Sequence, residues 1–432
     1  MRTAPSSGGG VGWRVSAKFA ADLGGRVLLL ALFVVAARIL PADDFGRYAF
    51  ALAVGLVAAQ LADSGLQVSL LRRLSAENDQ GASGKALADA LRVRLIVGLA
   101  LGIGAGLLAG SVGESPAQAL ALAAIAIAQI VAAQAELWLQ VARAAGRLEL
   151  EAAAGLVGRA FVVALGVLAL AVGGELPGLG LAYVVGSVLS VVVARLVANR
   201  FLATGRGAGG WASLRETWLD ALPLAVAGAA SLLMFRIDVL LLQWLRDSET
   251  VGVYSAAYRP FEAALLVPVA IMAAGFPRLV RAAADPPAFR ALAWRLAGVL
   301  LACAVAACLF GWLAGPPLIR FLFGAPYEAA GGLLLILVLA LPAIYVNALL
   351  TQAIVALRRP WLVAASMAAA LAANVALNLM LIPQLGATGA AIATVIAETT
   401  LLGASLAALV GISRARRTRQ PAGRTRAADP RG

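Results

Sequence analysis

The sequence predicts an all-α polytopic membrane protein whose twelve transmembrane helices form two lobes of six. Hydrophobic residues make up 62% of the 432-residue chain and charged residues 13%, whereas soluble domains have about 45–50% and about 25%. The apolar residues form twelve stretches, and each approaches the ~20 residues that a helix needs to cross a bilayer. The Lys and Arg residues between the stretches fall almost entirely on every second connection.

The twelve stretches are predicted to be helices because barrel strands are about half as long and alternate strictly between apolar and polar residues. In chain order the predicted segments are 19–40, 48–71, 93–110, 117–141, 152–173, 176–198, 219–245, 251–275, 291–314, 331–356, 361–382 and 387–411.

The distribution of basic residues predicts that both termini lie in the cytoplasm. With that orientation 28 of the 35 basic residues lie on the cytoplasmic side and only four on the opposite side, as the positive-inside rule requires. The cytoplasmic set includes Lys18, Arg94, Arg143 and Arg159. Three arginines belong to neither side and lie within predicted segments, and intramembrane charges are usually functional. Arg26, Arg236 and Arg259 are therefore the first candidate site residues.

The net charge of +13 indicates anionic lipids as partners and gives no indication of nucleic acid. The basic residues are spread over six predicted cytoplasmic connections and a tail, instead of forming one folded patch. Anionic headgroups of the inner leaflet attract such residues.

The predicted domain organisation follows from the segments and a Gly-rich connection in the middle of the chain. It comprises a cytoplasmic segment at 1–16, a first lobe of six helices at 17–200, a cytoplasmic connection at 201–218, a second lobe at 219–411 and a basic, disordered tail at 412–432.

Short matches between the two halves indicate an internal duplication. Gly46-Arg-Tyr48 recurs as Gly252-Val-Tyr254, an offset of 206, and two further pairs of matches have offsets of 209 and 212. Six helices per half is an even number, so the halves should share one orientation and be related by a pseudo-two-fold axis along the membrane normal. A cavity between such lobes is the expected place for transported material.

The chain has no residues that predict an enzyme, a cofactor or a metal centre. It contains no His, no Gly-rich phosphate-binding loop with Lys, and two cysteines, Cys303 and Cys308, that are expected to be inert. Coupling to Na+ or H+, if the protein uses it, must run on carboxylates, amides, hydroxyls or backbone groups.

Several stretches resemble the Wzx-type oligosaccharide flippases, which share a superfamily with the MATE exporters and the lipid II flippase MurJ. They are Ala37-Arg-Ile-Leu-Pro-Ala-Asp-Asp-Phe45-Gly-Arg-Tyr48, Ala62-Asp63-Ser-Gly65-Leu66, Ile237-Asp238-Val239-Leu240, Val251-Gly-Val-Tyr254-Ser-Ala-Ala-Tyr258-Arg259, Phe276-Pro277-Arg278, Phe323-Gly-Ala-Pro-Tyr327 and the run from Asn374 to Ala393. The resemblance covers nearly the whole chain, and its order and spacing are more specific than any one motif.

The resemblance implies a V-shaped, alternating-access bundle in the bacterial cytoplasmic (inner) membrane. It implies a polyprenyl-diphosphate-linked oligosaccharide as substrate, moved from the inner to the outer leaflet for surface polysaccharide biosynthesis. A polysaccharide polymerase and glycosyltransferases are the protein partners it suggests. The chain departs from MurJ-like proteins, which typically have fourteen helices, and this counts against lipid II as the substrate.

A diphosphate that crosses hydrocarbon needs compensating positive charge, and a guanidinium can bind phosphate through two hydrogen bonds. Arg26, Arg236 and Arg259 are therefore predicted to bind substrate. For Arg26 the alternative is a neutral pair with Asp22, one turn earlier. Asn374 and Asn378 are predicted to bind sugar hydroxyls, with helix packing as the alternative.

Among the acidic residues in predicted segments, Asp238 and Glu398 are predicted to couple an ion to transport. The alternative is that these carboxylates pair with the arginines and are structural. Two other functions stay open at this stage. One is a MATE-like, cation-coupled exporter of small molecules, which would favour an acidic or aromatic cavity. The other is a non-transporting scaffold for glycan assembly.

Overall fold

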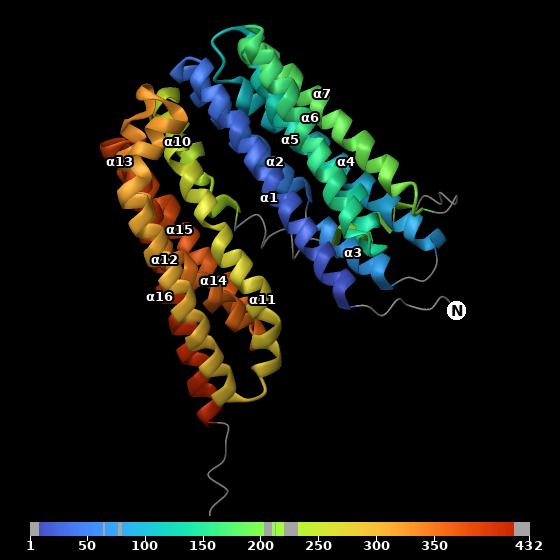
Figure 1. Ribbon diagram of the computed structural model, residues 1–432, viewed down its shortest axis with the longest axis vertical. Coiled ribbons are helices and arrows are strands. Elements are labelled where there is room, and N and C mark those ends of the chain that lie inside the picture. The colour runs from blue at the N-terminus through green and yellow to red at the C-terminus, as the bar shows by residue number, and fades with distance from the viewer. Residues whose placement is uncertain are drawn as a thin grey trace, which may run out of the picture. The chain divides into compact units, whose positions relative to one another are not determined.

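A computed structural model describes residues 8–63, 65–76, 80–202, 210–211, 213–219 and 232–418. Within these ranges the chain is built from helices and contains no β-strand, which confirms the predicted all-α class (Figure 1). The helices are α1 (Gly8–Ile39), α2 (Ala42–Asp63), α3 (Leu66–Ala76), α4 (Gln80–Gly110), α5 (Pro116–Ala144), α6 (Leu148–Ala171), α7 (Glu175–Ala198), α9 (Ile237–Leu245), α10 (Ser248–Ala264), α11 (Leu266–Ala282), α12 (Pro286–Phe323), α13 (Ala329–Leu337), α14 (Leu341–Ala356), α15 (Pro360–Leu385) and α16 (Ala387–Thr418), with short 3₁₀ turns η1 (Ala325–Tyr327) and η2 (Val338–Ala340).

The ends of α5 illustrate how local sequence sets the helix limits. The Ser115 side chain accepts a hydrogen bond from the backbone N–H of Gln118 at 3.2 Å, and Pro116 follows as the first helical residue. A proline is tolerated there because its missing N–H would have no helical partner. After the helix, Gly146 adopts a φ of +72°, a conformation that glycine reaches without a Cβ penalty.

Eleven of the described stretches are long and apolar enough to cross a membrane. Pairs of consecutive helices, such as α2 with α3 and α10 with α11, form single spans. The seventh predicted segment, 219–245, runs over residues 220–231, which lie outside the described residues. The count of twelve is consistent with these spans and stays a prediction.

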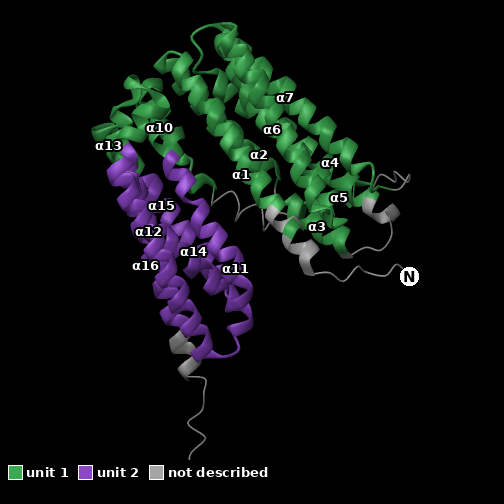
Figure 2. Cartoon of the chain, in the orientation of Figure 1, with its two compact units in different colours: residues 1–259, 316–333, 378–390 green, residues 260–315, 334–377, 391–432 purple. Residues whose placement is uncertain are grey.

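The chain divides into two compact units (Figure 2). Unit 1 comprises residues 1–259, 316–333 and 378–390, and unit 2 comprises residues 260–315, 334–377 and 391–432. Each unit groups segments whose backbones pack closely together. The two lobes of the predicted domain organisation stay a prediction.

In unit 1, α5 packs against α7, α4 and α2, and α6 packs against α7 and α1. One end of the unit has an aromatic core. The Phe45 ring lies 4.8 Å from Phe33 and 5.2 Å from Tyr327, measured between ring centroids, and these three side chains are at most 1% exposed. Edge-to-face contacts of this kind add to the burial of apolar area. They join the first two helices to the segment that follows α12.

The two repeat-related glycines also meet within unit 1. A Cβ added to Gly46 would lie 1.6 Å from the carbonyl oxygen of Ser248, and one added to Gly252 would lie 3.4 Å from the Gly46 Cα. Helix α2 therefore crosses the start of α10 at a point where neither helix has room for a side chain. The sequence repeat identified these two positions as equivalent, and the close approach explains why both are glycine.

In unit 2, α11 packs against α14. The Tyr345 hydroxyl donates to the backbone carbonyl of Ala264 at 2.7 Å, and the Cys308 thiol donates to the carbonyl of Val338 at 2.9 Å. These bonds satisfy polar groups between apolar helices. Cys303 and Cys308 are both free thiols in the structure.

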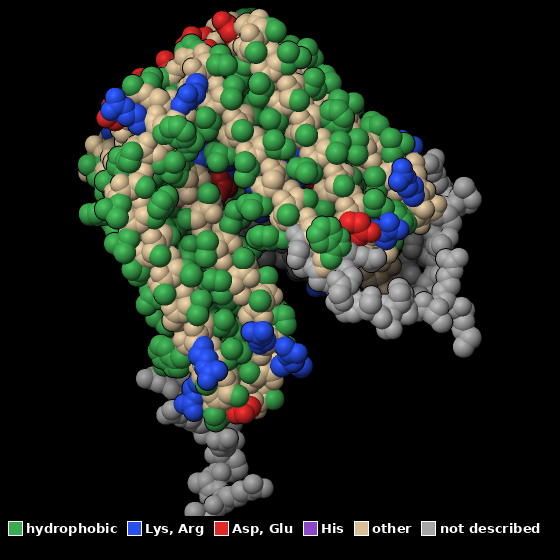
Figure 3. Space-filling model, viewed as in Figure 1, with side chains coloured by type: hydrophobic (Ala, Val, Ile, Leu, Met, Phe, Trp, Pro, Cys, Tyr) green, Lys and Arg blue, Asp and Glu red, His purple; other side chains and the backbone are tan. Residues whose placement is uncertain are grey.

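The surface of the helices is apolar along their length. Figure 3 shows hydrophobic side chains over the visible face, with Lys and Arg side chains near the helix ends. Leu313, Val172 and Leu107 are more than 70% exposed, which is unfavourable in water and favourable against lipid tails. The structure thus agrees with a protein that is embedded in a bilayer on most of its outer surface.

Candidate functional site

Unit 1 contains a polar cavity of about 490 Å³ between its membrane-spanning helices. Five basic and four acidic side chains line it, together with four amide and three hydroxyl side chains. The charged residues are Lys18, Arg26, Arg94, Arg143 and Arg159, and Asp22, Asp63, Glu136 and Glu151. Charges are costly inside a bilayer unless they pair or face water. A cavity with this lining is the main candidate site, and we call it the polar cavity.

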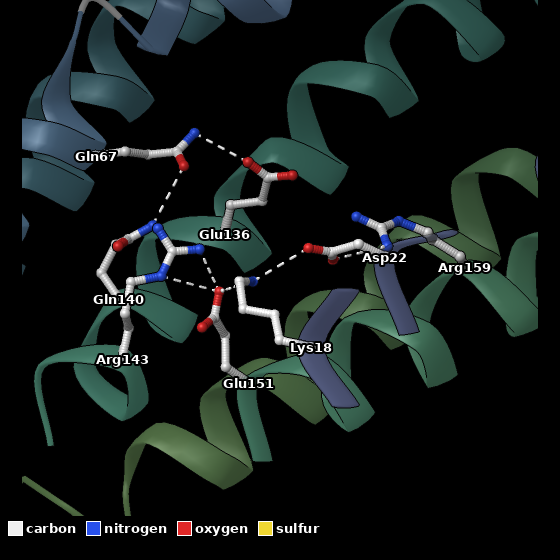
Figure 4. Close-up of polar contacts among 8 residues, drawn as sticks. All are labelled: Lys18, Asp22, Gln67, Glu136, Gln140, Arg143, Glu151 and Arg159. Carbon is white, nitrogen blue, oxygen red and sulfur yellow. Dashed lines mark hydrogen bonds and ion pairs between the residues drawn. The ribbon is translucent and has the colours of Figure 1, made fainter. Parts of the chain in front are cut away.

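A cluster of ion pairs lies at the end of the polar cavity where α1 begins, α5 ends and α6 begins (Figure 4). Glu151 Oε1 accepts hydrogen bonds from Lys18 Nζ at 2.8 Å and from Arg143 Nε at 3.0 Å. Asp22 pairs with Lys18 at 3.3 Å and with Arg159 at 3.7 Å. Two carboxylates therefore hold three basic side chains from three helices.

A chain of amides crosses the same cavity. Gln140 Nε2 donates to Gln67 Oε1 at 3.2 Å, and Gln67 Nε2 donates to Glu136 Oε2 at 2.9 Å. Figure 4 shows these three side chains beside the ion pairs. Amides and carboxylates supply both donors and acceptors, so this wall is able to hydrogen-bond hydroxyl groups of a sugar.

The topology count assigned Arg94, the second residue of the predicted segment 93–110, to the cytoplasmic side. Helix α4 begins at Gln80, and Arg94 lies well inside the candidate span from Gly84 to Gly110. Its side chain is completely buried, pairs with Asp63 and donates to the carbonyl of Ala133. Asp63 is thus paired with an arginine that the count of basic residues had assigned to the cytoplasmic side.

Arg26 lies on α1 and lines the polar cavity, as its predicted role requires. The alternative, a neutral pair with Asp22, is not formed, because Asp22 pairs with Lys18 and Arg159 instead. Arg26 is exposed, and it makes no ion pair with any residue that the structure describes. Its charge is consequently available within the cavity.

Arg236 and Arg259 do not line the polar cavity. They lie together in a second, very small pocket. Each guanidinium covers an aromatic ring: Arg236 lies 5.6 Å from the centroid of Tyr258, and Arg259 lies 4.1 Å from that of Phe33. The same pocket is lined by both arginines and both rings. Cation–π contacts of this kind stabilise a desolvated cation. The two arginines that the sequence treats separately thus form one cationic group.

The backbone is not helical at Arg236, where the sequence predicts the interior of a continuous helix. Residues 235 and 236 form a turn, and α9 begins at Ile237. Asp238, in the first turn of α9, is buried; its carboxylate accepts from the Tyr254 hydroxyl and, at 2.9 Å, from the backbone N–H of Val239. A carboxylate there is stabilised by the N-terminal end of the helix.

The second predicted coupling residue, Glu398 on α16, is buried in unit 2. Its carboxylate Oε2 and its backbone carbonyl both accept from Asn347 Nδ2 at 3.0 Å. No basic side chain within the described residues forms an ion pair with it. Asn374 and Asn378 lie one turn apart on α15, and both side chains are buried. The roles predicted for Asp238, Glu398, Asn374 and Asn378 stay predictions.

A family model described as "Polysaccharide biosynthesis protein" matches residues 14–283. The match covers more than half of the chain. This chain belongs to the polysaccharide biosynthesis protein family. The resemblance to Wzx-type flippases that the sequence motifs indicated is thereby confirmed. The prediction of a multi-pass membrane protein is confirmed as well.

The fold of this family member is similar to solved structures of the MOP superfamily. An inward-facing multidrug resistance MATE family transporter aligns with a TM-score of 0.74 at 17% identity, covering 91% of this chain and 96% of that one. The lipid II flippase MurJ, in an inward closed conformation, aligns with a TM-score of 0.72 at 15% identity, covering 91% and 87%.

An outward-facing MATE family transporter has a TM-score of 0.60 at 15% identity, covering 93% and 94%. Identities this low show a shared fold and nothing finer. Comparison with curated protein sequences finds no significant match.

Proposed function

We propose that this protein moves a polyprenyl-diphosphate-linked oligosaccharide from the inner to the outer leaflet of the bacterial cytoplasmic membrane, with both termini in the cytoplasm. The family membership supports a part in polysaccharide biosynthesis, and the fold supports transport without catalysis. The observation that carries the proposal is the polar cavity. It places an excess of basic over acidic side chains beside amides, within helices whose outer faces are apolar.

The chemistry of the cavity fits an amphiphile with a charged link. A diphosphate needs cations that are already inside the membrane, because transferring charge into hydrocarbon unaided costs several kcal/mol or more. Lys18 and Arg26 supply two such cations on α1. The amide wall of Gln67, Gln140 and Glu136 suits sugar hydroxyls, and the lipid chain can remain in the bilayer. The volume lies within the ~300–1,000 Å³ that is usual for small-molecule sites.

Other parts of the proposal rest on the sequence. Arg236 and Arg259 are proposed to bind the diphosphate at a later point of its passage, since they form one cationic group. Asn374 and Asn378 are proposed to bind sugar, and Asp238 and Glu398 to couple Na+ or H+ movement to transport. We further propose two six-helix lobes at 17–200 and 219–411, with a polymerase and glycosyltransferases as partners.

A MATE-like exporter of small molecules is the second candidate, because MATE transporters share the fold. The charge of the polar cavity argues against the cationic compounds that such a carrier would take. Basic residues outnumber acidic ones there, and Arg26 is not neutralised by any described side chain. An exporter of cations would require the opposite balance.

Complementation in cells tests the proposal. A strain that lacks the protein is expected to accumulate a lipid-linked oligosaccharide in the inner leaflet and to lose surface polysaccharide. Arg26→Ala is expected to restore little polymer while the protein stays in the membrane, because loss of one charge-assisted contact weakens binding roughly tenfold. Arg320→Ala is the matched control, since Arg320 is 68% exposed and only distantly paired with Glu328. Normal polysaccharide in the deletion strain would refute the proposal.

A further inference from the structure

The ion-pair cluster of the polar cavity holds its cations in an unusual way. Three basic side chains, Lys18, Arg143 and Arg159, all pair with only two carboxylates. With Arg26 the cluster has four basic and two acidic side chains. The carboxylates come from two different helices, and each contacts two cations. Glu151 and Asp22 therefore occupy the donors that an incoming anion would need.

The position of Glu151 is that of a bound anion. Its side chain is 5% exposed, and its Oε1 accepts from both Lys18 and Arg143. The other oxygen, Oε2, is buried and has no hydrogen-bond partner among the residues that the structure describes. A phosphate bound by a Lys and an Arg makes the same charge-assisted contacts. The carboxylate thus makes the contacts that one phosphate group would make in the polar cavity.

Arg159 reaches the cluster across a glycine. A Cβ on Gly25 would lie 2.5 Å from Arg159 Nη1 and 2.6 Å from its Cδ. The Arg159 guanidinium therefore lies against the backbone of α1 at Gly25. Its Nη1 atom lies 3.7 Å from the carboxylate of Asp22, which is about one helical turn before Gly25. The side chain lines the cavity, so a ligand that displaced Asp22 would meet a donor already in place.

We infer that Glu151 and Asp22 are internal counter-ions that compete with the diphosphate of the substrate for Lys18, Arg143 and Arg159. The inference rests on the proposed function and adds a mechanism of release to it. In the structure each of the three cations has a carboxylate partner that holds it in position. When the diphosphate binds, it replaces the two carboxylates at the cations. When the carboxylates pair with the cations again, they lower the affinity of the protein for the diphosphate and favour its release. A carrier needs such a limit, because a ligand that binds too tightly does not leave.

The alternative is that the cluster is only a structural link between α1, α5 and α6. The two explanations predict opposite results for Glu151→Gln. If the carboxylate is a link, its loss disorders the cations and weakens anion binding. If the carboxylate is a competitor, its loss frees the cations and strengthens binding. Glutamine keeps the shape of the side chain and removes only its charge.

Binding measurements on the full-length protein in lipid nanodiscs distinguish the two. The probes are farnesyl diphosphate, which presents the diphosphate on a lipid, and inorganic pyrophosphate, which presents it alone. Glu151→Gln is expected to lower the Kd for farnesyl diphosphate by roughly tenfold, equivalent to about 1.4 kcal/mol, and Asp22→Asn by a smaller factor. Lys18→Ala is expected to raise the Kd. Tighter pyrophosphate binding in parallel would identify the diphosphate itself as the recognised group, and an effect confined to farnesyl diphosphate would identify its membrane-bound form.

Glu149→Gln is the matched control. Glu149 lies on the same turn of α6, pairs with Arg147 at 2.6 Å and does not line the polar cavity, so its Kd should equal that of the unaltered protein. A rate measurement adds a second criterion. Glu151→Gln should lower both the KM and the kcat of lipid transport, because binding is tighter and release slower, and a purely structural defect would not lower the KM.

Unchanged or weaker binding by a folded Glu151→Gln protein would overturn the inference. If that variant fails to fold, Asp22→Asn decides, since the Asp22 side chain is 43% exposed and its loss is tolerated more easily; unchanged binding there would also overturn it. Failure of the proposed function gives a different result. In that case the unaltered protein would bind neither probe and would transport no diphosphate lipid.

Discussion

The buried pair of Arg94 and Asp63 gives the sharpest prediction about stability. The Arg94 side chain is fully buried and that of Asp63 is 11% exposed. Replacing Asp63 with Leu leaves the guanidinium buried, with the Ala133 carbonyl as its described hydrogen-bond partner and no carboxylate bonded to it. Removing one member of a buried pair typically destabilises a protein by about 3–5 kcal/mol, since the other charge stays uncompensated. We expect the lower end of that range, because Asp63 lines a polar cavity.

A double-mutant cycle separates this effect from a general loss of packing. The variants are Asp63→Leu, Arg94→Met and the two together, and the quantity is the free energy of unfolding in mixed detergent micelles. Each single change should destabilise by about 3 kcal/mol, while the double variant should be close to the unaltered protein, since apolar replacements of both partners are often neutral. Single losses that simply add in the double variant would refute the reasoning, because they would show no coupling between the two charges.

Two further predictions concern packing and hydrogen bonding. Gly46→Ala should destabilise the protein by about 1–3 kcal/mol, because the added methyl group meets the Ser248 carbonyl, whereas Gly104→Ala, with nothing within 4 Å, should not; equal thermal stability of both variants would contradict the helix crossing. Asn347→Leu should destabilise by about 1–3 kcal/mol, since the buried Glu398 carboxylate loses its amide donor; the unfolding free energy measures this, and no change would show that Glu398 has another donor.

The membrane-spanning architecture could be predicted because its physical cause is local. Lipid requires long apolar helices, and any window of sequence shows them. The predicted segment ends were less accurate. Helix α4 starts at Gln80, well before the predicted residue 93. The start was predicted too late because Lys85 and Arg92 made the preceding turns resemble a loop, whereas both side chains are exposed on the helix.

The candidate site could be predicted only in part. Arg26 was found by subtracting the basic residues that topology explains, and it does line the polar cavity. The same subtraction discarded Lys18, Arg143 and Arg159, which line that cavity as well. Lys18 pairs with Asp22 on its own helix, but the other partners lie on other helices: Glu151 is 133 residues from Lys18 in the chain. Local spacing allowed Asp22 to pair with Arg26 or with Lys18, and it forms the pair with Lys18. No pattern within one helix reveals the second pair, with Arg159.

The glycine crossing shows what an internal repeat adds. Gly46 and Gly252 were noticed as corresponding positions in two halves, and the structure brings them to within van der Waals contact. Neither position by itself predicts a crossing, since glycine is common in membrane helices. Equivalent positions in a duplicated chain meet only near its symmetry axis, so the contact agrees with the proposed two-fold relation between the halves.

The central claim is that this protein moves a diphosphate-linked glycan lipid across the bilayer, and a leaflet assay on purified protein tests it most directly. Vesicles would contain the protein and a fluorescent polyprenyl-diphosphate-linked oligosaccharide, and a membrane-impermeant quencher would report the fraction in the outer leaflet over time. We predict rapid exchange between leaflets with the unaltered protein and at least roughly tenfold slower exchange with Arg26→Ala. Exchange no faster than in protein-free vesicles would contradict the account.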